Sequence, residues 1–215
     1  MRKSLLFVWA CMGLVCLMSA CKTSVKSKEW KLVWVEDFDQ KNSFDESVWT
    51  KIPRGTSDWN NYMSYYDSCY AMQDGNLILR GIANHTQKND TAPYLTGGVY
   101  TKGKKLFTGG RVEVCARLQA AKGAWPAIWM LPEKAEWPKG GEIDIMERLN
   151  HDHIAYQTTH SYYTHILGIK DNPPHGGINK INLEEYNIYS VDIYPDSLVF
   201  AVNHRHTYTY PRIDT

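Results

Sequence analysis

The sequence predicts an all-β domain, built as a sandwich or jelly roll, and three observations support this class. From residue 30 onward, short runs rich in Val, Ile, Tyr and Trp alternate with clusters of Gly, Pro, Asn and Asp. The sequence shows no sustained amphipathic helical pattern, internal repeat or low-complexity tract. Aromatic residues are abundant, with 8 Trp, 14 Tyr and 5 Phe, and such rings both fill cores and line ligand clefts. Many short strands separated by turns are typical of two packed sheets.

Strands are expected where β-prone runs lie between turn signals. The clearest alternation is in residues 111–118, where the Val residues would share one face and the charged residues the other. Residues 163–180 contain paired Pro and paired Gly and are expected to form a long loop, a feature that is often functional. The expected strands are residues 31–38, 76–81, 98–101, 111–118, 127–131, 142–148, 155–160, 186–194 and 197–202.

The first twenty residues have the features of a secretory signal peptide. Arg2 and Lys3 precede an apolar stretch over residues 5–18, which is short for a membrane span and ends in small residues before Cys21. The end of this stretch resembles a bacterial lipobox, which implies that Cys21 is lipidated and becomes the mature N-terminus. An ordinary signal peptide cut nearby is the alternative.

The sequence therefore divides into a signal peptide (1–20), a lipidated Cys with a polar tether (21–29) and one domain (30–215). The expected location is the cell envelope, with the protein lipid-anchored in the outer membrane and facing the periplasm or the surface. A net charge of +1 argues against a nucleic-acid partner and suits a neutral polysaccharide, and a monomer is expected. Cys69 and Cys115 can form a disulfide or remain free thiols.

Three carboxylates, Glu142, Asp144 and Glu147, lie within six residues. On a regular strand Glu142 and Asp144 share a face, and a one-residue bulge near Met146 would bring Glu147 to that face. In retaining glycosidases, one of two carboxyl groups about 5–5.5 Å apart attacks the anomeric carbon while the other protonates the leaving oxygen. Asp144 between the two Glu residues would disfavour ionisation of all three, so that one proton is retained. A solvated acidic strand face is the alternative.

Upstream, Trp125 and Trp129 would share one face of a strand with a small residue between them, forming a platform for sugar rings. Burial of both indoles in the core is the alternative. Trp137 is a weaker candidate for the same cleft. Asn61 can hydrogen-bond sugar hydroxyls, although a turn explains it equally well.

The histidines suggest two further roles. His151 with His153, and His204 with His206, have a spacing that can chelate a metal, but no third ligand is evident, so surface roles are favoured and no metal is assigned. His160 ends the strand expected after the acidic strand. It is placed to hydrogen-bond a catalytic carboxylate or a substrate hydroxyl.

Residues 142–147 resemble the acidic signature of glycoside hydrolase family 16 in its bulged form. The resemblance extends over residues 31–37, 74–79, 109–118, 125–131 and 137–147, and is greatest to the laminarinase side of the family. It implies a concanavalin A-like β-jelly-roll with an open concave cleft. It further implies a retaining, endo-acting hydrolase of a β-linked polysaccharide, in the first place a β-1,3- or mixed-linkage glucan.

The resemblance also implies roles for individual residues. It assigns Glu142 as nucleophile, Asp144 as its electrostatic partner and Glu147 as general acid/base. It carries over Trp125, Trp129 and His160 as subsite residues. No cofactor is required, while some family members hold a structural calcium away from the cleft.

Other functions remain open from the sequence. Residues 59–66 and 96–99 depart from the laminarinase pattern, so an endo-β-galactosidase acting on keratan-, mucin- or agar-type glycans is an alternative. A non-catalytic carbohydrate-binding jelly roll and a metal-binding surface lipoprotein are two more. The resemblance further leads us to expect that the domain lacks one or more C-terminal strands, because family members usually continue past the position of Thr215.

Overall fold

The structure is a computed structural model that describes residues 30–40, 42–119 and 121–213. The chain divides into residues 1–31 and residues 32–215, and every described strand lies in the second unit. The signal peptide and Cys21 expected from the sequence lie outside the described residues. In the part of the chain that is described, no helix is long and apolar enough to span a membrane.

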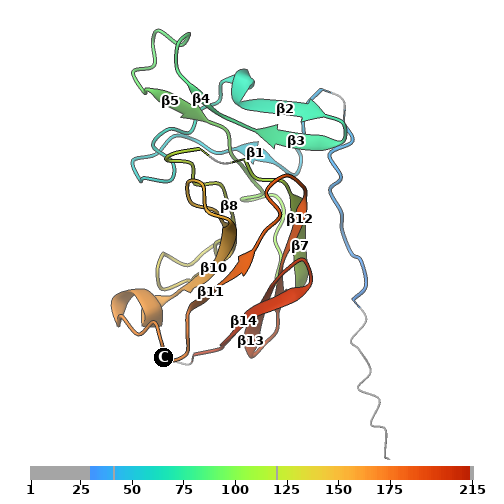
Figure 1. The fold of residues 1–215 in the computed structure, drawn as a ribbon, viewed down its shortest axis with the longest axis vertical. Coiled ribbons are helices and arrows are strands. Elements are labelled where there is room, and N and C mark those ends of the chain that lie inside the picture. Colours follow the sequence, from blue (N-terminus) through green and yellow to red (C-terminus); the bar gives the residue numbers. More distant parts are fainter. Residues whose placement is uncertain (1–29, 41, 120, 214–215) are drawn as a thin grey trace, which may run out of the picture. The chain divides into compact units, whose positions relative to one another are not determined.

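Two four-stranded antiparallel sheets form a sandwich, as Figure 1 shows. The sheet that carries the acidic strand, here called the acidic sheet, has the order β11-β10-β9-β8. The opposite sheet, here called the second sheet, has the order β14-β13-β12-β7. The acidic sheet consists of β8 (Ala127–Met130), β9 (Glu142–Glu147), β10 (Ile154–His160) and β11 (Gly176–Lys180), and the second sheet of β7 (Gly110–Ala116), β12 (Asn187–Ile193), β13 (Ser197–Val202) and β14 (Arg205–Pro211).

Three two-stranded sheets complete the described strands, and two of them lie above the sandwich in Figure 1. A short 3-10 helix precedes β2, and a one-turn π-helix follows β10. The bounds are β1 (Thr50–Lys51) with β6 (Val99–Tyr100), β2 (Tyr70–Gln73) with β3 (Asn76–Leu79), β4 (Gly81–Ala83) with β5 (Tyr94–Thr96), η1 (Asp67–Cys69) and η2 (Tyr162–Ile166).

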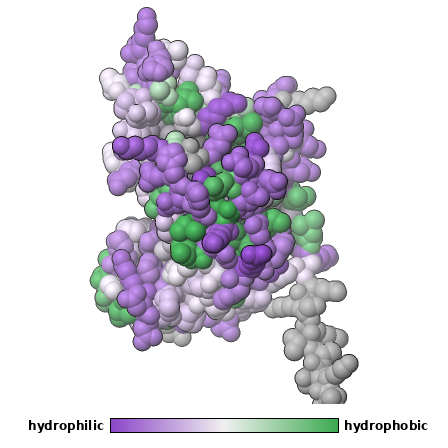
Figure 2. All heavy atoms as spheres, in the orientation of Figure 1, coloured by the Kyte–Doolittle hydropathy of each residue, from purple (hydrophilic) through white to green (hydrophobic). Residues whose placement is uncertain are grey.

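The hydrophobic core lies between the acidic sheet and the second sheet. Ile145 and Met146 of β9 are 1% exposed and belong to one buried cluster with aromatic and Val residues of the second sheet. Within it, Phe200 and Tyr208 stack with ring centroids 4.5 Å apart. Figure 2 shows that polar residues cover most of the outer face in view, with apolar residues gathered midway along it. The sandwich therefore buries one face of each sheet and leaves the other faces available for a site.

The tight turns follow from their sequences. Asp74 and Gly75 both have positive φ and join β2 to β3 in a two-residue hairpin, as expected for Asp-Gly. Asn203 and His204 also have positive φ and join β13 to β14 in the same way. The alternation expected for residues 111–118 is confirmed over β7, where the Val residues are half-buried and Arg111, Glu113 and Cys115 are exposed.

Several expectations for the secondary structure were wrong. Residues 31–38 are not a strand, and residues 76–81 form two strands, because the chain leaves the β2–β3 hairpin and starts β4 at Gly81. The expected loop over residues 163–180 contains most of η2 and all of β11. Besides β11, four strands were not expected: β1, β2, β5 and β14.

Cys69 and Cys115, the two cysteines in the part of the chain that the structure describes, are both free thiols. Cys69 is fully buried at the end of η1, and Cys115 is exposed on β7. Burial raises the pKa of the Cys69 thiol, which makes it less reactive. The disulfide left open by the sequence is therefore absent between these two residues.

Candidate active site

The bulge expected in the acidic strand is present. Across β9 and β10, Thr158 pairs with Asp144 and Tyr156 pairs with Glu147, so Ile145 and Met146 together oppose one residue. The pairing of β8 with β9 shifts at the same place. Both bulge side chains turn into the core, where they are 1% exposed. The extra residue allows Glu147 to face the same side as Asp144.

Each of the two glutamates accepts a hydrogen bond from an indole. Trp137 Nε1 donates to Glu142 Oε2 at 2.7 Å, and Trp125 Nε1 donates to Glu147 Oε1 at 2.7 Å. Both indoles are about half exposed, so part of each ring also faces solvent. Neither bond is predicted from the sequence, where the Trp rings are interpreted as stacking surfaces. The need of an indole N–H for a partner was the signal that could have indicated them.

Asp144 lies between the two glutamates along the strand and is only 4% exposed. His160 Nε2 lies 3.2 Å from Asp144 Oδ2, and His160 pairs with Glu142 across the β9–β10 ladder. The hydrogen bond to Asp144 raises the pKa of His160, and the charges of the two glutamates act in the same direction. The structure thus brings His160 to the carboxylate cluster, where it contacts Asp144.

The pKa values of both glutamates are raised. Burial is the main cause for Glu142 and for Glu147, and the charge of Asp144 adds to it in each case. The indole N–H bonds oppose this rise, as does the charge of His160. A cluster of this kind holds a proton more tightly than isolated carboxylates do, and it titrates as a unit. Such an arrangement can supply one ionised carboxylate and one carboxylic acid at the same time.

Trp129 lies beside the carboxylates. Among the described ring contacts there is none between Trp129 and Trp125, the other residue of the expected platform. It pairs with Asp144 across the β8–β9 ladder, so its side chain belongs to the same face of the sheet. Its ring meets Trp59 edge to face, with centroids 5.2 Å apart. Asn61, two residues further along, has a side-chain oxygen that is buried and has no hydrogen bond within the described residues.

A cavity of about 390 Å³ opens at one end of the sandwich. Its lining includes Glu142 and His160 but neither Asp144 nor Glu147. Its other walls come from the β12–β13 turn and the end of β14, including Tyr210. It therefore adjoins the carboxylate cluster from the side of the core and is not the surface on which both glutamates meet.

Within the described residues, the paired histidines do not join a larger group of side chains that could hold a metal ion. Among the residues that the structure describes, no group of three or more His, Cys, Asp or Glu side chains is placed to hold a metal ion. His206 instead contacts the Thr209 hydroxyl at 3.0 Å, and His204 lies 4.0 Å from Glu113. These contacts fit the surface roles favoured by the sequence.

A β-sandwich with clustered carboxylates and indoles on an open sheet face is typical of proteins that act on carbohydrates. A family model described as "XgeA-like, catalytic GH16 domain" matches residues 70–186. The chain is 30% identical over 208 residues to a beta-glucanase of Rhodothermus marinus, covering 91% of this chain and 71% of that protein. The chain belongs to glycoside hydrolase family 16.

Two further comparisons agree with this assignment. A keratan-sulfate endo-1,4-beta-galactosidase of Sphingobacterium multivorum is 38% identical over 200 residues, and the match covers 89% of this chain but only 46% of that relative. The chain thus spans about half the length of this relative. The laminarinase structure from Rhodothermus marinus superposes with a TM-score of 0.74 at 29% identity, covering 85% of this chain and 75% of that one. The jelly-roll expected from the sequence is confirmed.

Proposed function

We propose that this domain is a retaining endo-β-glycosidase that cleaves internal bonds of a β-linked polysaccharide. The observation that carries the proposal is the bulged strand β9, which presents Glu142 and Glu147 on one face with the buried Asp144 between them. In this mechanism the Glu142 carboxylate attacks the anomeric carbon while Glu147 gives its proton to the leaving oxygen. Glu147 then takes a proton from water as the water breaks the glycosyl–Glu142 bond.

Asp144 and His160 support this mechanism. Burial raises the pKa of Glu147 and the negative charge of Asp144 adds to it, which favours the protonated acid needed for the first step. His160 hydrogen-bonds Asp144, so this buried carboxylate has a cationic or hydrogen-bonding partner and keeps a defined orientation. Neither residue exchanges atoms with the sugar.

The test is hydrolysis by Glu142→Gln and Glu147→Gln on a panel of laminarin, mixed-linkage β-glucan and keratan sulfate. We expect both variants to lose activity by at least about 100-fold, the scale of a lost acid or base. Azide, added as an external nucleophile, distinguishes the role of Glu142 from that of Glu147. In Glu142→Ala it should attack the sugar from the vacated side and give an inverted glycosyl azide, and in Glu147→Ala it should give a retained one.

Undiminished hydrolysis in both Gln variants would contradict the catalytic assignment. Glycan binding by the wild-type domain with no product after long digestion would favour a non-catalytic binding jelly roll instead. The panel also decides the sugar. A β-1,3- or mixed-linkage glucan is the first candidate, supported by the laminarinase and beta-glucanase relatives. Cleavage of keratan sulfate alone would favour the second candidate, an endo-β-galactosidase, which the 38% identity to the keratan-sulfate enzyme supports.

We further propose that the protein is a lipoprotein of the bacterial cell envelope, anchored through Cys21. The support is the sequence of residues 1–21, with its charged start, short apolar stretch and small residues before the Cys. Labelling cells with a fatty acid should mark the wild-type protein and leave Cys21→Ser unlabelled. Equal labelling of both proteins, or of neither, would contradict this anchor.

A further inference from the structure

The indole of Trp137 makes a ring contact in addition to its hydrogen bond with Glu142. Its Nε1 donates to Glu142 Oε2 at 2.7 Å, and its ring meets the imidazole of His165 edge to face, with centroids 4.4 Å apart. Trp137 lies before β9, whereas His165 belongs to η2, which follows β10. The indole is 48% exposed, so packing in the core does not by itself fix its orientation. The contact with His165 therefore restricts a ring that would otherwise turn more freely.

A second contact joins the same two segments. The ammonium group of Lys139 lies 6.0 Å from the ring centroid of Tyr162, within the range of a cation–π contact. Tyr162 is the first residue of η2, and Lys139 lies two residues after Trp137. Because the segment before β9 meets η2 at two positions, we expect the two segments to move together.

A capping box fixes η2 to the end of β10. The Ser161 hydroxyl accepts a hydrogen bond from the Thr164 N–H at 3.2 Å, and the Thr164 hydroxyl oxygen accepts one from the Ser161 N–H at 2.9 Å. Thr164 is 1% exposed. His160, which pairs with Glu142 across the β9–β10 ladder, directly precedes Ser161. The start of η2 is therefore held at a defined place beside the strand that carries Glu142.

His165 acts on Glu142 through the indole. The imidazole is exposed, and within the described residues no hydrogen bond or ion pair joins it to the Glu142 carboxylate. Burial and the charge of Asp144 raise the pKa of Glu142, while the Trp137 N–H and the charge of His160 lower it. Of these four causes, the Trp137 bond is the one that a contact with the indole ring can strengthen or weaken.

We propose that His165 is a positioning residue that holds the Trp137 indole so that its N–H points at Glu142. The proposal rests on the proposed glycosidase function, because Glu142 is the nucleophile of that reaction. It extends that function by giving η2, a segment outside the acidic sheet, a part in keeping the nucleophile ionised before the sugar binds. Edge-to-face ring pairs favour one arrangement about 2- to 10-fold, which sets the scale of this control.

The first test is a spectroscopic titration that needs no catalysis. The indole N–H signal of Trp137 in a proton–nitrogen NMR spectrum is assigned by its loss in Trp137→Phe, and its change with pH reports the ionisation of Glu142. In His165→Ala we expect the signal to move towards that of a free indole and to report a higher pKa of Glu142. The reason is that the bond that stabilises the carboxylate is made less often. His165→Phe keeps a ring without a charge, so it should restore most of the wild-type signal.

The second test is the pH dependence of kcat/KM on the preferred polysaccharide. His165→Ala should move the acidic limb to higher pH and lower kcat/KM on that limb by at most about 10-fold. In the Trp137→Phe background the same substitution should cause no further shift, because the bond through which His165 acts is already absent.

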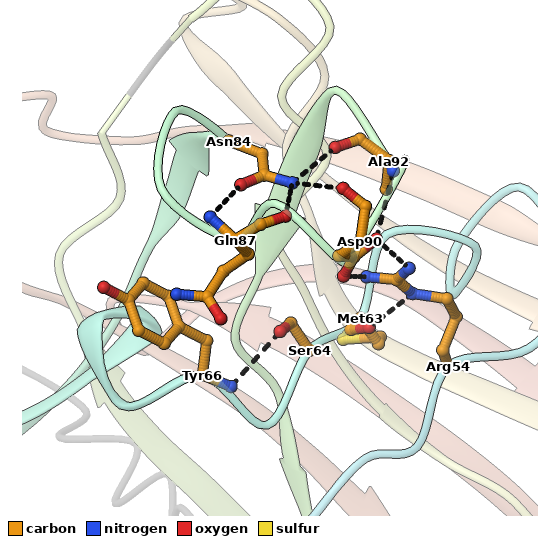
Figure 3. A network of polar contacts seen from close by, with 8 residues as sticks. All are labelled: Arg54, Met63, Ser64, Tyr66, Asn84, Gln87, Asp90 and Ala92. Carbon is orange, nitrogen blue, oxygen red and sulfur yellow. Dashed lines mark hydrogen bonds and ion pairs between the residues drawn. The ribbon is translucent and has the colours of Figure 1, made fainter.

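Arg54→Ala is the control for a general loosening of a loop. Figure 3 shows the polar network in which the Arg54 guanidinium pairs with both carboxylate oxygens of Asp90 at 2.7 Å and donates through Nε to the carbonyl of Met63 at 2.9 Å. None of the contacts described for Arg54 reaches Trp137 or η2. Its loss should therefore lower Tm and leave the indole signal and the acidic limb in place.

Thermal melting checks that each variant is folded before the signals are compared. An unchanged indole signal in His165→Ala, or the same change in Arg54→Ala, would overturn the proposal. Equal changes in His165→Phe and His165→Ala would do so as well, since they would assign the effect to the imidazole itself and not to a ring contact. The glycosidase function is decided separately. A changed indole signal in a domain that releases no product from any polysaccharide would contradict the catalytic function and retain the positioning of Trp137 by His165.

Discussion

The two indole bonds to Glu142 and Glu147 have opposite consequences for the two carboxyl groups. A donated N–H stabilises the ionised carboxylate and lowers its pKa. For Glu142, the proposed nucleophile, this favours the reactive form, whereas for Glu147, the proposed general acid, it opposes the protonated form. Burial and Asp144 raise both pKa values, so the indoles partly offset a rise that would otherwise be larger.

Removing each indole N–H should therefore move a different limb of the pH–rate profile. Trp137→Phe keeps a ring but raises the pKa of Glu142, so the acidic limb of kcat/KM should move to higher pH and narrow the profile. Trp125→Phe raises the pKa of Glu147, so the basic limb should move to higher pH and widen it. The measurement is kcat/KM against pH for both variants. Unchanged limbs, or the same limb moving in both, would contradict this account.

The contact between His160 and Asp144 predicts a pH-dependent stability. The folded-state pKa of His160 is raised above its ordinary value of 6.5, so the fold favours the protonated ring. The stabilisation should be fully present below about pH 6.5 and be lost as the pH rises through the raised folded-state value. His160→Gln should lower Tm by a few degrees at pH 5.5, about the effect of 1 kcal/mol, and by less at pH 9. A constant difference at both pH values would show that the His160 charge contributes nothing.

At the scale of elements, the sequence predicted the structure best where a residue pattern allows only one local backbone conformation. The run Glu142–Glu147 has apolar residues that must enter the core, so only a bulge brings all three acids together, and the bulge is present. Asp74 and Gly75 likewise allow few turns other than the one observed. The predictions for the cleft were less complete, because the indole bonds depend on how the segments that precede β8 and β9 fold against the acidic strand, which spacing along the chain does not determine.

The wrong predictions of strands and loops also have their physical causes in contacts between segments. Residues 31–38 are rich in β-branched and aromatic residues, yet a strand needs a hydrogen-bonded neighbour, and propensity alone does not supply it. In β11 the Gly pair was interpreted as loop, whereas Gly177 lies where an added Cβ would come within 2.8 Å of Thr207. In β14 the alternation of Tyr208 and Tyr210, both buried, is the signal that could have predicted the strand.

A close approach between elements gives a second stability prediction. Gly97 follows β5 directly, and a Cβ added there would overlap the backbone carbonyl oxygen of Cys69. Because backbone cannot move aside cheaply, Gly97→Ala should lower the free energy of unfolding by about 1–3 kcal/mol in urea titrations. Gly81→Ala is the control, since its Cβ would meet only Thr96 at an ordinary 3.6 Å and its effect should stay within about 0.5 kcal/mol. Equal effects of the two substitutions would contradict this reason.

At the scale of the whole sandwich, the two sheets are joined by buried polar contacts as well as by apolar packing. The fully buried side-chain amide of Gln157 on β10 donates to the carbonyl of Ile145 at 2.7 Å in its own sheet and of Ala201 at 3.2 Å in the second sheet. The hydroxyls of Thr159 and Tyr208 lie 2.9 Å apart across the same gap. Such contacts specify how the sheets align, because a slip would leave buried polar groups without partners.

Gln157→Glu tests this bridge, because it replaces the donating amide with a carboxyl group at a fully buried position facing backbone carbonyl oxygens. Ionisation there is disfavoured, so the folded-state pKa of the new carboxyl should lie above its unfolded value of about 4.3. The loss of stability should then be smallest below about pH 4.3. It should grow by about 1.4 kcal/mol per pH unit until the pH reaches the folded-state pKa. Urea unfolding across this pH range measures this loss of stability.

Gln157→Met is the control, because it also lacks the donor but cannot ionise. Its loss of stability relative to wild type should therefore not vary with pH. Parallel pH curves for the two variants would show that position 157 is open to water and does not bridge the sheets.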